Sequence, residues 1–219
     1  QMDVTPLIAP QDGLVDLVHW IGLAQTSLNI HLYQLQQMNL FNAILDAQYS
    51  GVDVTLVLDA GDEYFWSSYD MDMQYGLAAE LSYAGVNVLW FSASNDDPYL
   101  FIHSKVAVRD GQSVWMGSGN WKPSSLPLPG TWGNRDWGVI IDHAEFANEV
   151  LSQMQHDEDV SRQHIRQASA SDMPVGWQLP SDSSYTGNLT NKISGNFSGQ
   201  LITCPDNCIS GLVSMIDSS

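Results

Sequence analysis

The sequence predicts an α/β fold in which a mixed, largely parallel sheet is flanked by helices. Strand-like and helix-like segments alternate over 14–91, an order that favours parallel strands joined by helical crossovers. Further on, apolar runs over 101–109 and 113–116 meet at Asp110-Gly111, a turn typical of a β-hairpin. We expect this hairpin to join the same sheet. With 219 residues, the chain can bury one core and part of a second unit.

The periodicity of apolar residues predicts the individual elements. A short extended entry over 5–8 ends at Pro10, and Asp12 is placed to cap a helix whose apolar residues recur at helical spacing as far as Ile21. The alternation over 27–33 predicts a strand. The next elements should be a helix over 40–48, a buried strand over 52–59, a helix over 76–84 and a strand over 86–91.

A final strand and helix are expected after the hairpin. Residues 137–141 form an apolar run, and Asp142 with Glu145 has the spacing of a capping box, which predicts that Asp142 is the N-cap of the last helix. The histidines near this helix and in the first predicted helix and strand lack carboxylate or cysteine partners at ligand spacing. We therefore interpret them as surface or capping residues rather than metal ligands: His19, His31, His143, His156 and His164.

Composition separates three parts of the chain. Residues 1–166 carry the regular periodicity and form the predicted domain, whereas 167–200 are rich in Ser, Gly and Asn and are predicted to be a linker. The stretch Leu201-Ile202-Thr203-Cys204-Pro205 then echoes Leu7-Ile8-Ala9-Pro10. This echo predicts that residues 201–219 begin a second repeat, of which the first 166 residues are one copy.

Charge and the two cysteines indicate the environment and the class of partner. The net charge is −18, with only three Lys and four Arg, so the surface as a whole repels polyanions at long range. The chain begins at Gln1 without a signal peptide, and we expect a secreted protein, extracellular or at the cell surface, from which the signal has been removed. Cys204 and Cys208 form a local disulfide, form a bridge to a cysteine outside this sequence, or remain two free thiols.

The chemistry concentrates between Phe101 and Asn120. His103 and Lys105 are two residues apart, so both would point to one face if this stretch is a strand. An imidazole beside an ammonium suits an anionic oxygen, because Lys supplies a compact charge and His can attack or transfer a proton. The second strand of the hairpin would deliver Ser118 and Asn120 at its end.

These residues carry a resemblance to a known family. His103-x-Lys105-x4-Asp110, followed after six residues by Gly117-Ser118-x-Asn120, resembles the signature of the phospholipase D superfamily, the HxKxxxxD phosphodiesterases. Asn134-Arg135-Asp136, which runs into the strand over 137–141, looks like the family's next element, although the family usually has Glu where this chain has Asp136. The order of the predicted strands and helices also resembles the family's repeat.

The resemblance implies a mechanism and assigns roles to residues. Phosphodiesters would be hydrolysed or transferred through a covalent phosphohistidine, with Lys105 and Asn120 holding the non-bridging oxygens. Asp136 would orient a histidine ring, Ser118 would make a supporting hydrogen bond, and Asp110 would have a structural role at the turn. Side chains would supply the positive charge, so neither a cofactor nor a metal is implied.

One motif supplies one histidine, whereas the mechanism needs a nucleophile and an acid. The second HxKxxxxD half would come from a missing C-terminal part, which makes this chain the N-terminal half of a two-motif member, or from a homodimer mate. A phospholipid is the favoured substrate. The alternatives are a metal-independent nuclease of the same superfamily, which would use the same residues, and a non-catalytic binding half.

Three aromatic residues are candidates for the wall of a substrate pocket. Trp66, together with Tyr64 and Phe65, follows a predicted strand end, where sheets of this kind place binding loops. Tyr33 ends the strand over 27–33, and Trp121 follows Asn120 directly. Packing in the core is the alternative for Trp121, because large aromatic side chains commonly serve that purpose.

Overall fold

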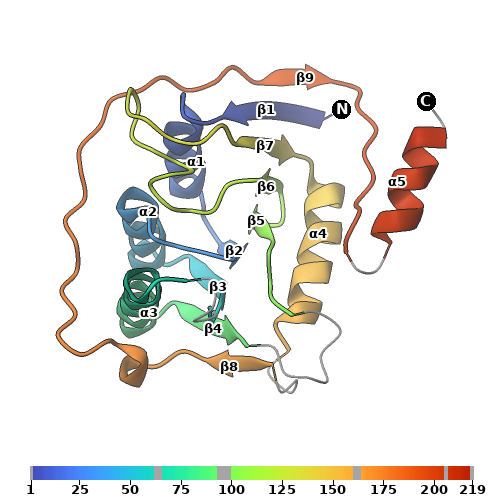
Figure 1. Ribbon diagram of the computed structural model, residues 1–219. Coiled ribbons are helices and arrows are strands. Elements are labelled where there is room, and N and C mark those ends of the chain that lie inside the picture. The colour runs from blue at the N-terminus through green and yellow to red at the C-terminus, as the bar shows by residue number, and fades with distance from the viewer. Residues whose placement is uncertain (1, 62–65, 93–99, 160–163, 205–206, 218–219) are drawn as a thin grey trace.

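One twisted sheet organises the protein in a computed structural model (Figure 1). The structure describes residues 2–61, 66–92, 100–159, 164–204 and 207–217. Within these ranges nine strands lie in the order β8-β4-β3-β2-β5-β6-β7-β1-β9. The strands are β1 (Met2–Ile8), β2 (Ser27–Leu32), β3 (Asp53–Asp59), β4 (Asn87–Phe91), β5 (Lys105–Arg109), β6 (Ser113–Gly117), β7 (Trp137–Asp142), β8 (Ile165–Gln167) and β9 (Ile193–Gly195).

The fold is mixed α/β as predicted, but the sheet is mostly antiparallel. Among the described strands, β2–β3 and β3–β4 are the parallel pairs, and every other neighbouring pair is antiparallel. The expectation of a largely parallel sheet is therefore wrong. The helical crossovers end with β4, after which the chain re-enters the sheet through the β5–β6 hairpin and continues as an antiparallel meander into β7.

Helices cover both faces of the sheet (Figure 1). Helices α1 (Gly13–Gly22), α2 (Met38–Tyr49) and α3 (Ser68–Tyr83) pack on one face, and α4 (Ala144–Asp157) packs on the other. The alternation along β2 explains the larger core, because Leu28, Ile30 and Leu32 are fully buried beneath the three helices. Val108 and Val114 of the hairpin form a smaller core with α4.

Three helix starts differ from the sequence prediction, and that of α2 lies two residues earlier than expected. Helix α3 begins at Ser68, eight residues before the predicted start, because Ser67 and Asp70 form a capping box. Helix α4 begins one residue later than expected, and the Nδ1 atom of His143 accepts the hydrogen bond from the Phe146 N–H at 3.3 Å. Asp142 is therefore not the N-cap: it ends β7 and pairs with Lys192 at 2.7 Å.

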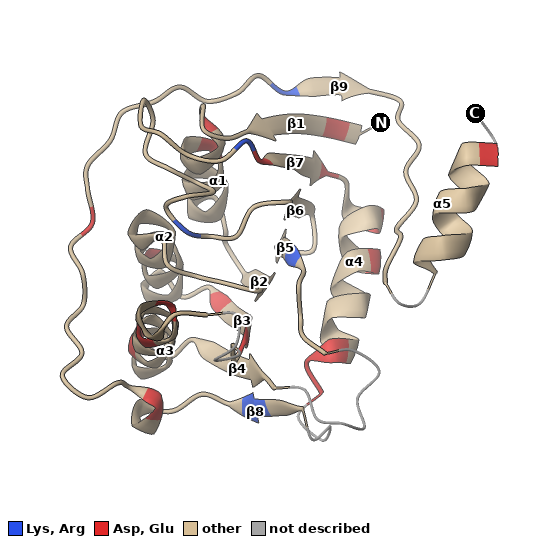
Figure 2. Ribbon diagram, viewed as in Figure 1, with Lys and Arg blue, Asp and Glu red and all other residues tan. Residues whose placement is uncertain are grey.

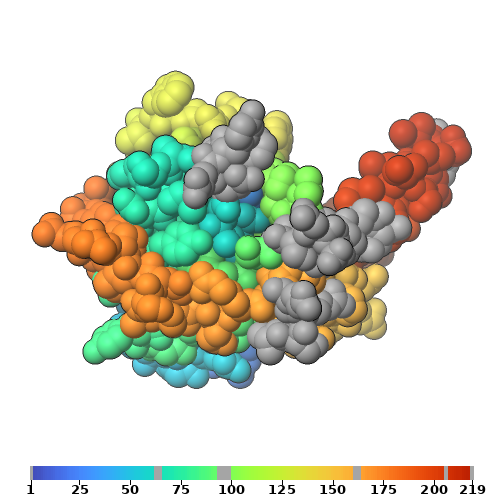
Figure 3. Space-filling view, turned by 60° about the horizontal axis from the view of Figure 1, so that its bottom comes forward, coloured from blue at the N-terminus to red at the C-terminus, as the bar shows by residue number. Residues whose placement is uncertain are grey.

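Residues 168–192, which connect β8 to β9, run from one edge of the sheet to the other and are called the belt here (Figure 1). Trp177 packs on α3 at Gly76, Asn42 of α2 donates to Asp182, and β9 pairs with β1 at the far edge of the sheet. The residues predicted to be a linker, 167–200, thus lie against the domain. They then lead to helix α5 (Cys208–Asp217), which projects from the body of the molecule (Figure 3).

A disulfide joins Cys204 to Cys208, the first residue of α5, and the two Cα atoms are 5.0 Å apart. Residues 201–203, which echo β1 in sequence, are not part of a strand. The prediction that a second repeat begins here stays a prediction. None of the helices within the described ranges has the length and apolar character needed to cross a membrane.

Candidate functional site

Five segments bring the motif residues to one edge of the sheet. The carboxyl ends of the parallel strands β2 and β3 lie side by side, and β5 runs antiparallel to β2, so the start of β5 reaches the same edge. The end of β6 and the start of β7 return there in turn. The side chains delivered by these five ends are Tyr33 and Gln34, Asp59, His103 and Lys105, Ser118 and Asn120, and Asp136.

Lys105 is the buried cation of the site. It opens β5 opposite Leu32, and only 7% of its surface is exposed. Its ammonium donates to the backbone oxygen of His103 at 2.7 Å and lies 5.3 Å from the centre of the Tyr33 ring. Burial lowers the pKa of Lys105 to about 8, against the opposing effect of the charges of Asp136 and Asp59. The group is charged at neutral pH, but it is poorly solvated.

His103 precedes the strand and remains accessible. It lies in irregular backbone ahead of β5, so the strand-like pairing expected for His103 and Lys105 does not hold, and His103 is exposed while Lys105 is buried. Its ring lies 4.8 Å from that of Tyr33 and 5.9 Å from that of Phe101. Partial burial and the charge of Lys105 lower the pKa of His103, which favours the neutral imidazole that a nucleophile requires.

Asp59 belongs to the site, although it stands far from the motif in the sequence. The side chain is 6% exposed at the end of β3 and accepts hydrogen bonds from the Gly61 N–H at 2.8 Å and the Ile102 N–H at 3.0 Å. It therefore fixes the backbone next to His103. A signal existed in the sequence, because a lone Asp at the end of a buried strand lies where such sheets place functional side chains.

Ser118 and Asp136 form a hydrogen-bonded pair at the ends of β6 and β7. The Ser118 hydroxyl donates to Asp136 at 2.8 Å and accepts from the Trp137 N–H at 3.0 Å. Gly119 makes this approach possible, because a Cβ there would lie 2.9 Å from the Asp136 carboxyl carbon. Within this chain Asp136 is held by Ser118, and its expected contact with a histidine ring stays a prediction.

Asp110 lies away from these residues, at the hairpin turn. Its carboxylate accepts from the backbone N–H groups of Gln25, Thr26 and Ser27 and from the Thr26 hydroxyl. Although burial acts to raise the pKa of Asp110, the hydrogen bonds from Ser27, Thr26 and Gln25 hold it below its ordinary value. These contacts join the turn to the start of β2, which is the structural role expected of this residue.

The aromatic candidates separate into two groups. The indole of Trp66 donates to the Tyr33 hydroxyl at 2.7 Å, and the Tyr33 ring in turn lies beside His103. Trp121 is fully buried in the main core against Trp115, and packing accounts for it. Tyr64 and Phe65 lie outside the described residues.

For two of the histidines away from the motif, the predicted surface position is wrong. His31 and His164 are 2% and 5% exposed, so the expected surface position is wrong for both. The His31 Nε2 atom lies 3.0 Å from a carboxylate oxygen of Glu158. His143 is a cap, as described above. Within the described ranges, no three His, Cys, Asp or Glu side chains gather in a group suited to a metal ion.

A cavity of about 690 Å³ adjoins the motif. It lies between α4, the start of β5 and residues 201–204, and its lining includes both His103 and Lys105. Most of the other lining is apolar, including Phe101, Met116 and Met154. Charge outside the site is predominantly negative, and Figure 2 shows acidic residues along α3 and α4 with few basic segments.

Comparisons with known proteins agree with this fold. The family described as "Cardiolipin synthase, PLD-like domain" matches residues 17–158. No curated protein sequence matches the chain. Nuc from Salmonella typhimurium, a phospholipase D family member, superposes with a TM-score of 0.62 at 20% identity, over 76% of this chain and 98% of Nuc. NucT from Helicobacter pylori superposes with a TM-score of 0.56 at 20% identity, over 71% of this chain and 95% of NucT.

A phosphatidylserine synthase from Haemophilus influenzae superposes with a TM-score of 0.52 at 16% identity, over 76% of this chain but only 40% of that enzyme. At these identities the superpositions establish the fold alone. The family match extends over more than half of the chain, and it includes the His103, Lys105 and Asn120 positions. The chain belongs to the phospholipase D-like domain family.

Proposed function

We propose that the protein cleaves phosphodiesters through a covalent phosphohistidine formed on His103. The observation that carries this proposal is the pairing of an accessible histidine, whose pKa is lowered by burial and by Lys105, with a buried ammonium whose pKa is about 8. At neutral pH the imidazole is free to attack phosphorus, and the ammonium is charged. A poorly solvated cation also gains more from an arriving phosphate than a solvated one does.

The chemistry divides into two displacements. A ring nitrogen of His103 forms a bond to phosphorus, and the bond from phosphorus to the leaving oxygen breaks as that oxygen takes a proton from an acid. Water then attacks the phosphohistidine and gives a proton back to the deprotonated acid, which releases a phosphate monoester and restores the free imidazole; an alcohol in place of water would give transfer. Lys105 and Asn120 hold the non-bridging oxygens in both steps, where negative charge accumulates.

The acid for the first step is a second histidine in this proposal. It would come from another HxKxxxxD half, either further along the natural protein or on a second copy of this chain. The exposed apolar side chains of α5 support additional protein packing there: Ile209, Leu212, Val213, Met215 and Ile216. The phosphatidylserine synthase of the same fold, of which this chain covers 40%, is consistent with a longer arrangement.

We favour a phospholipid over a nucleic acid as the substrate. The largely apolar cavity, whose lining includes His103, offers a place for a hydrocarbon chain, and a net charge of −18 disfavours a polyanion. We also propose that the protein is secreted, and the disulfide between Cys204 and Cys208 supports an oxidising compartment.

The test uses the longest natural form of the protein, assayed in EDTA on phosphatidylcholine micelles, on bis(4-nitrophenyl) phosphate and on single-stranded DNA. We expect cleavage of the first two substrates, because Lys105 and Asn120 supply the charge and donors that hold the phosphate. His103→Ala should abolish turnover, whereas His19→Ala, which alters an exposed histidine of α1, should leave it unchanged. Trapped phosphate should map to the peptide that contains His103.

Three results would count against parts of this proposal. Near-native turnover by folded His103→Ala would remove His103 from the mechanism. Activity lost in EDTA and restored by a divalent ion would overturn the metal-free chemistry. Cleavage of DNA with no action on the lipid would favour the nuclease alternative, which uses the same residues.

A further inference from the structure

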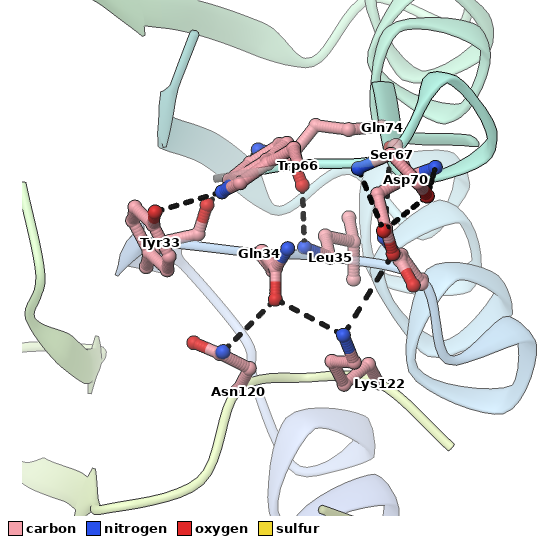
Figure 4. Close-up of polar contacts among 10 residues, drawn as sticks. Tyr33, Gln34, Leu35, Trp66, Ser67, Asp70, Gln74, Asn120 and Lys122 are labelled. Atoms are coloured by element: carbon pink, nitrogen blue, oxygen red, sulfur yellow. Dashed lines mark hydrogen bonds and ion pairs between the residues drawn. The ribbon is translucent and has the colours of Figure 1, made fainter. Parts of the chain in front are cut away.

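We propose that Gln34 is a positioning residue, which holds the Asn120 amide so that its NH₂ group, rather than its oxygen, is presented to the phosphate. The inference rests on the proposed function of Asn120 as a donor to the non-bridging oxygens. Gln34 is the second residue after β2 and is 5% exposed, so its amide is buried within the site rather than solvated (Figure 4).

The backbone places Gln34 next to Asn120. The Trp121 N–H donates to the backbone oxygen of Gln34 at 3.0 Å. The backbone oxygen of Trp121 accepts from the N–H groups of Gln36 and Gln37 at 2.7 and 2.9 Å. Trp121 itself is fully buried in the core. The segment after β2 is therefore hydrogen-bonded on both sides to Trp121, the residue that follows Asn120. These bonds set the distance between the side chains of Gln34 and Asn120.

The side-chain contacts fix the direction of both amides. The Gln34 Oε1 atom accepts from Asn120 Nδ2 at 3.0 Å and from Lys122 Nζ at 3.3 Å (Figure 4). An ammonium has only donors, so the Gln34 atom that faces Lys122 must be the oxygen. That oxygen in turn requires a donor from Asn120. The charge of Lys122 thereby determines which end of the Asn120 amide points at Gln34.

Lys122 is itself held in place. Its ammonium lies 3.7 Å from the Asp70 carboxylate, which also accepts from the Gln36 side chain at 3.0 Å. Although burial acts to raise the pKa of Asp70, hydrogen bonds from Ser67 and Gln36 and the charge of Lys122 hold it below its ordinary value. The first turn of α3 therefore anchors the cation that orients Gln34.

This arrangement has a direct consequence for phosphate binding. The Asn120 Nδ2 group has two hydrogens and donates one of them to Gln34, so the other is available to a substrate oxygen. The Asn120 Oδ1 atom is buried without a hydrogen-bond partner among the described residues. Without Gln34 the amide would be free to turn over, and the oxygen that then faced the phosphate would repel it.

The first test compares two buried glutamines of the same stretch. Gln34→Met removes the acceptor at similar volume, and we expect kcat to fall about tenfold to a hundredfold with little change in KM, because a misplaced donor weakens the transition state. Gln37 is also 5% exposed, but its side chain donates to the Leu126 oxygen at 2.7 Å. Gln37→Met should lower the melting temperature and leave kcat unchanged. Equal kcat losses in the two variants would overturn the proposal.

A double-mutant cycle shows whether Gln34 acts through Asn120. In the longest natural form of the protein, Gln34→Met should cost nothing further once Asn120→Ala is present, because the group it positions is gone. Losses that multiply in the double variant would mean that Gln34 acts independently of Asn120, and the proposal would be wrong.

The last measurement does not depend on turnover. In the wild type, the hydrogen that Asn120 Nδ2 donates to Gln34 should give a shifted, slowly exchanging side-chain amide signal in ¹⁵N-resolved NMR, identified by its loss in Asn120→Ala. Gln34→Met should return this signal to the position of a free amide, and Gln37→Met should not. An unchanged signal in Gln34→Met would refute the positioning role. A protein that cleaves no phosphodiester would refute the proposed function, while this signal would still decide the role of Gln34.

Discussion

Lys105 carries a positive charge where little water reaches it, and this placement costs stability. Burial lowers the pKa of Lys105 to about 8 from 10.5, so the unfolded chain binds this proton more tightly than the folded chain does. The free energy of unfolding therefore rises with pH between about 8 and 10.5. Below about pH 8 the burial of the charged ammonium lowers it by the full amount.

Lys105→Met should consequently make the protein more stable and inactive. We expect the free energy of unfolding at pH 7 to rise by about 1–2 kcal/mol, a value smaller than the full pKa shift implies because the variant also loses the hydrogen bond to the His103 oxygen. Urea unfolding of both proteins at pH 7 and pH 10 measures the effect, and the difference between them should shrink at the higher pH. A less stable variant would show that the hydrogen bond to the His103 oxygen outweighs the cost of burial.

The same two side chains predict a bell-shaped pH dependence of kcat/KM. The rate should increase as His103 loses its proton, at a pKa below its ordinary value, and decrease as Lys105 loses its proton near pH 8. Asp59→Asn should move the alkaline limb to lower pH, because the Asp59 charge raises the pKa of Lys105. The matched change Asp110→Asn, at the distant hairpin turn, should leave that limb in place. Identical alkaline limbs in all three proteins would contradict this account.

At the scale of elements, local patterns predicted the segments, and contacts distant in sequence determined the rest. The alternation of 27–33 and the Asp110-Gly111 turn were sufficient to predict β2 and the β5–β6 hairpin. Strand direction could not be derived in this way, because it depends on where the chain re-enters the sheet. The exposed position of His103 was likewise not predictable, since it follows from β5 beginning at Lys105.

The candidate site was predictable only where its residues form a motif. His103, Lys105 and Asn120 stand at family spacing, so the sequence is enough to propose them. The hydrogen bond between Asp59 and Ile102 joins residues 43 positions apart, and that between Gln34 and Asn120 joins residues 86 positions apart. No local sequence pattern predicts such pairs. Their roles follow from the β2–β3 and β2–β5 pairings that bring those ends together.

The close packing of the belt on α3 can be tested by substitution of Gly76. A Cβ added to Gly76 of α3 would lie 2.3 Å from the Trp177 ring, so Gly76→Ala should displace Trp177 and lower the free energy of unfolding by about 1–3 kcal/mol. Gly22→Ala, at the end of α1 with nothing within 4 Å, should be neutral or raise it by about 0.4–1 kcal/mol. Chemical denaturation measures both variants. In a Trp177→Ala background the cost of Gly76→Ala should disappear, and a cost that persists would mean that Trp177 does not occupy this position.

At the scale of the whole molecule, positive charge is scarce and two of the three lysines lie in the site. Lys105 and Lys122 are the lysines concerned, within a chain of net charge −18. The surrounding field opposes the approach of any long polyanion, and this opposition weakens as salt screens it. The distribution is consistent with a site that binds one phosphate group at a time rather than a charged strand.

The last prediction concerns the number of chains in one complete site. A single HxKxxxxD motif provides one of the two histidines that the proposed mechanism requires. We therefore expect a monomer of these 219 residues to be inactive on bis(4-nitrophenyl) phosphate, and activity to appear with a second copy or with a longer natural form. Light scattering on the assayed sample gives the oligomeric state that accompanies the activity.

Mixing experiments identify the source of the second half. If two copies share one site, adding His103→Ala protein to wild type and allowing exchange should reduce activity with the square of the wild-type fraction, because mixed dimers lack one histidine. Adding His19→Ala protein should cause no loss, which controls for dilution and exchange. An active longer form that shows only proportional loss on mixing would carry both halves in one chain. Full activity from a monomer of these 219 residues, with proportional loss on mixing, would refute the two-half arrangement.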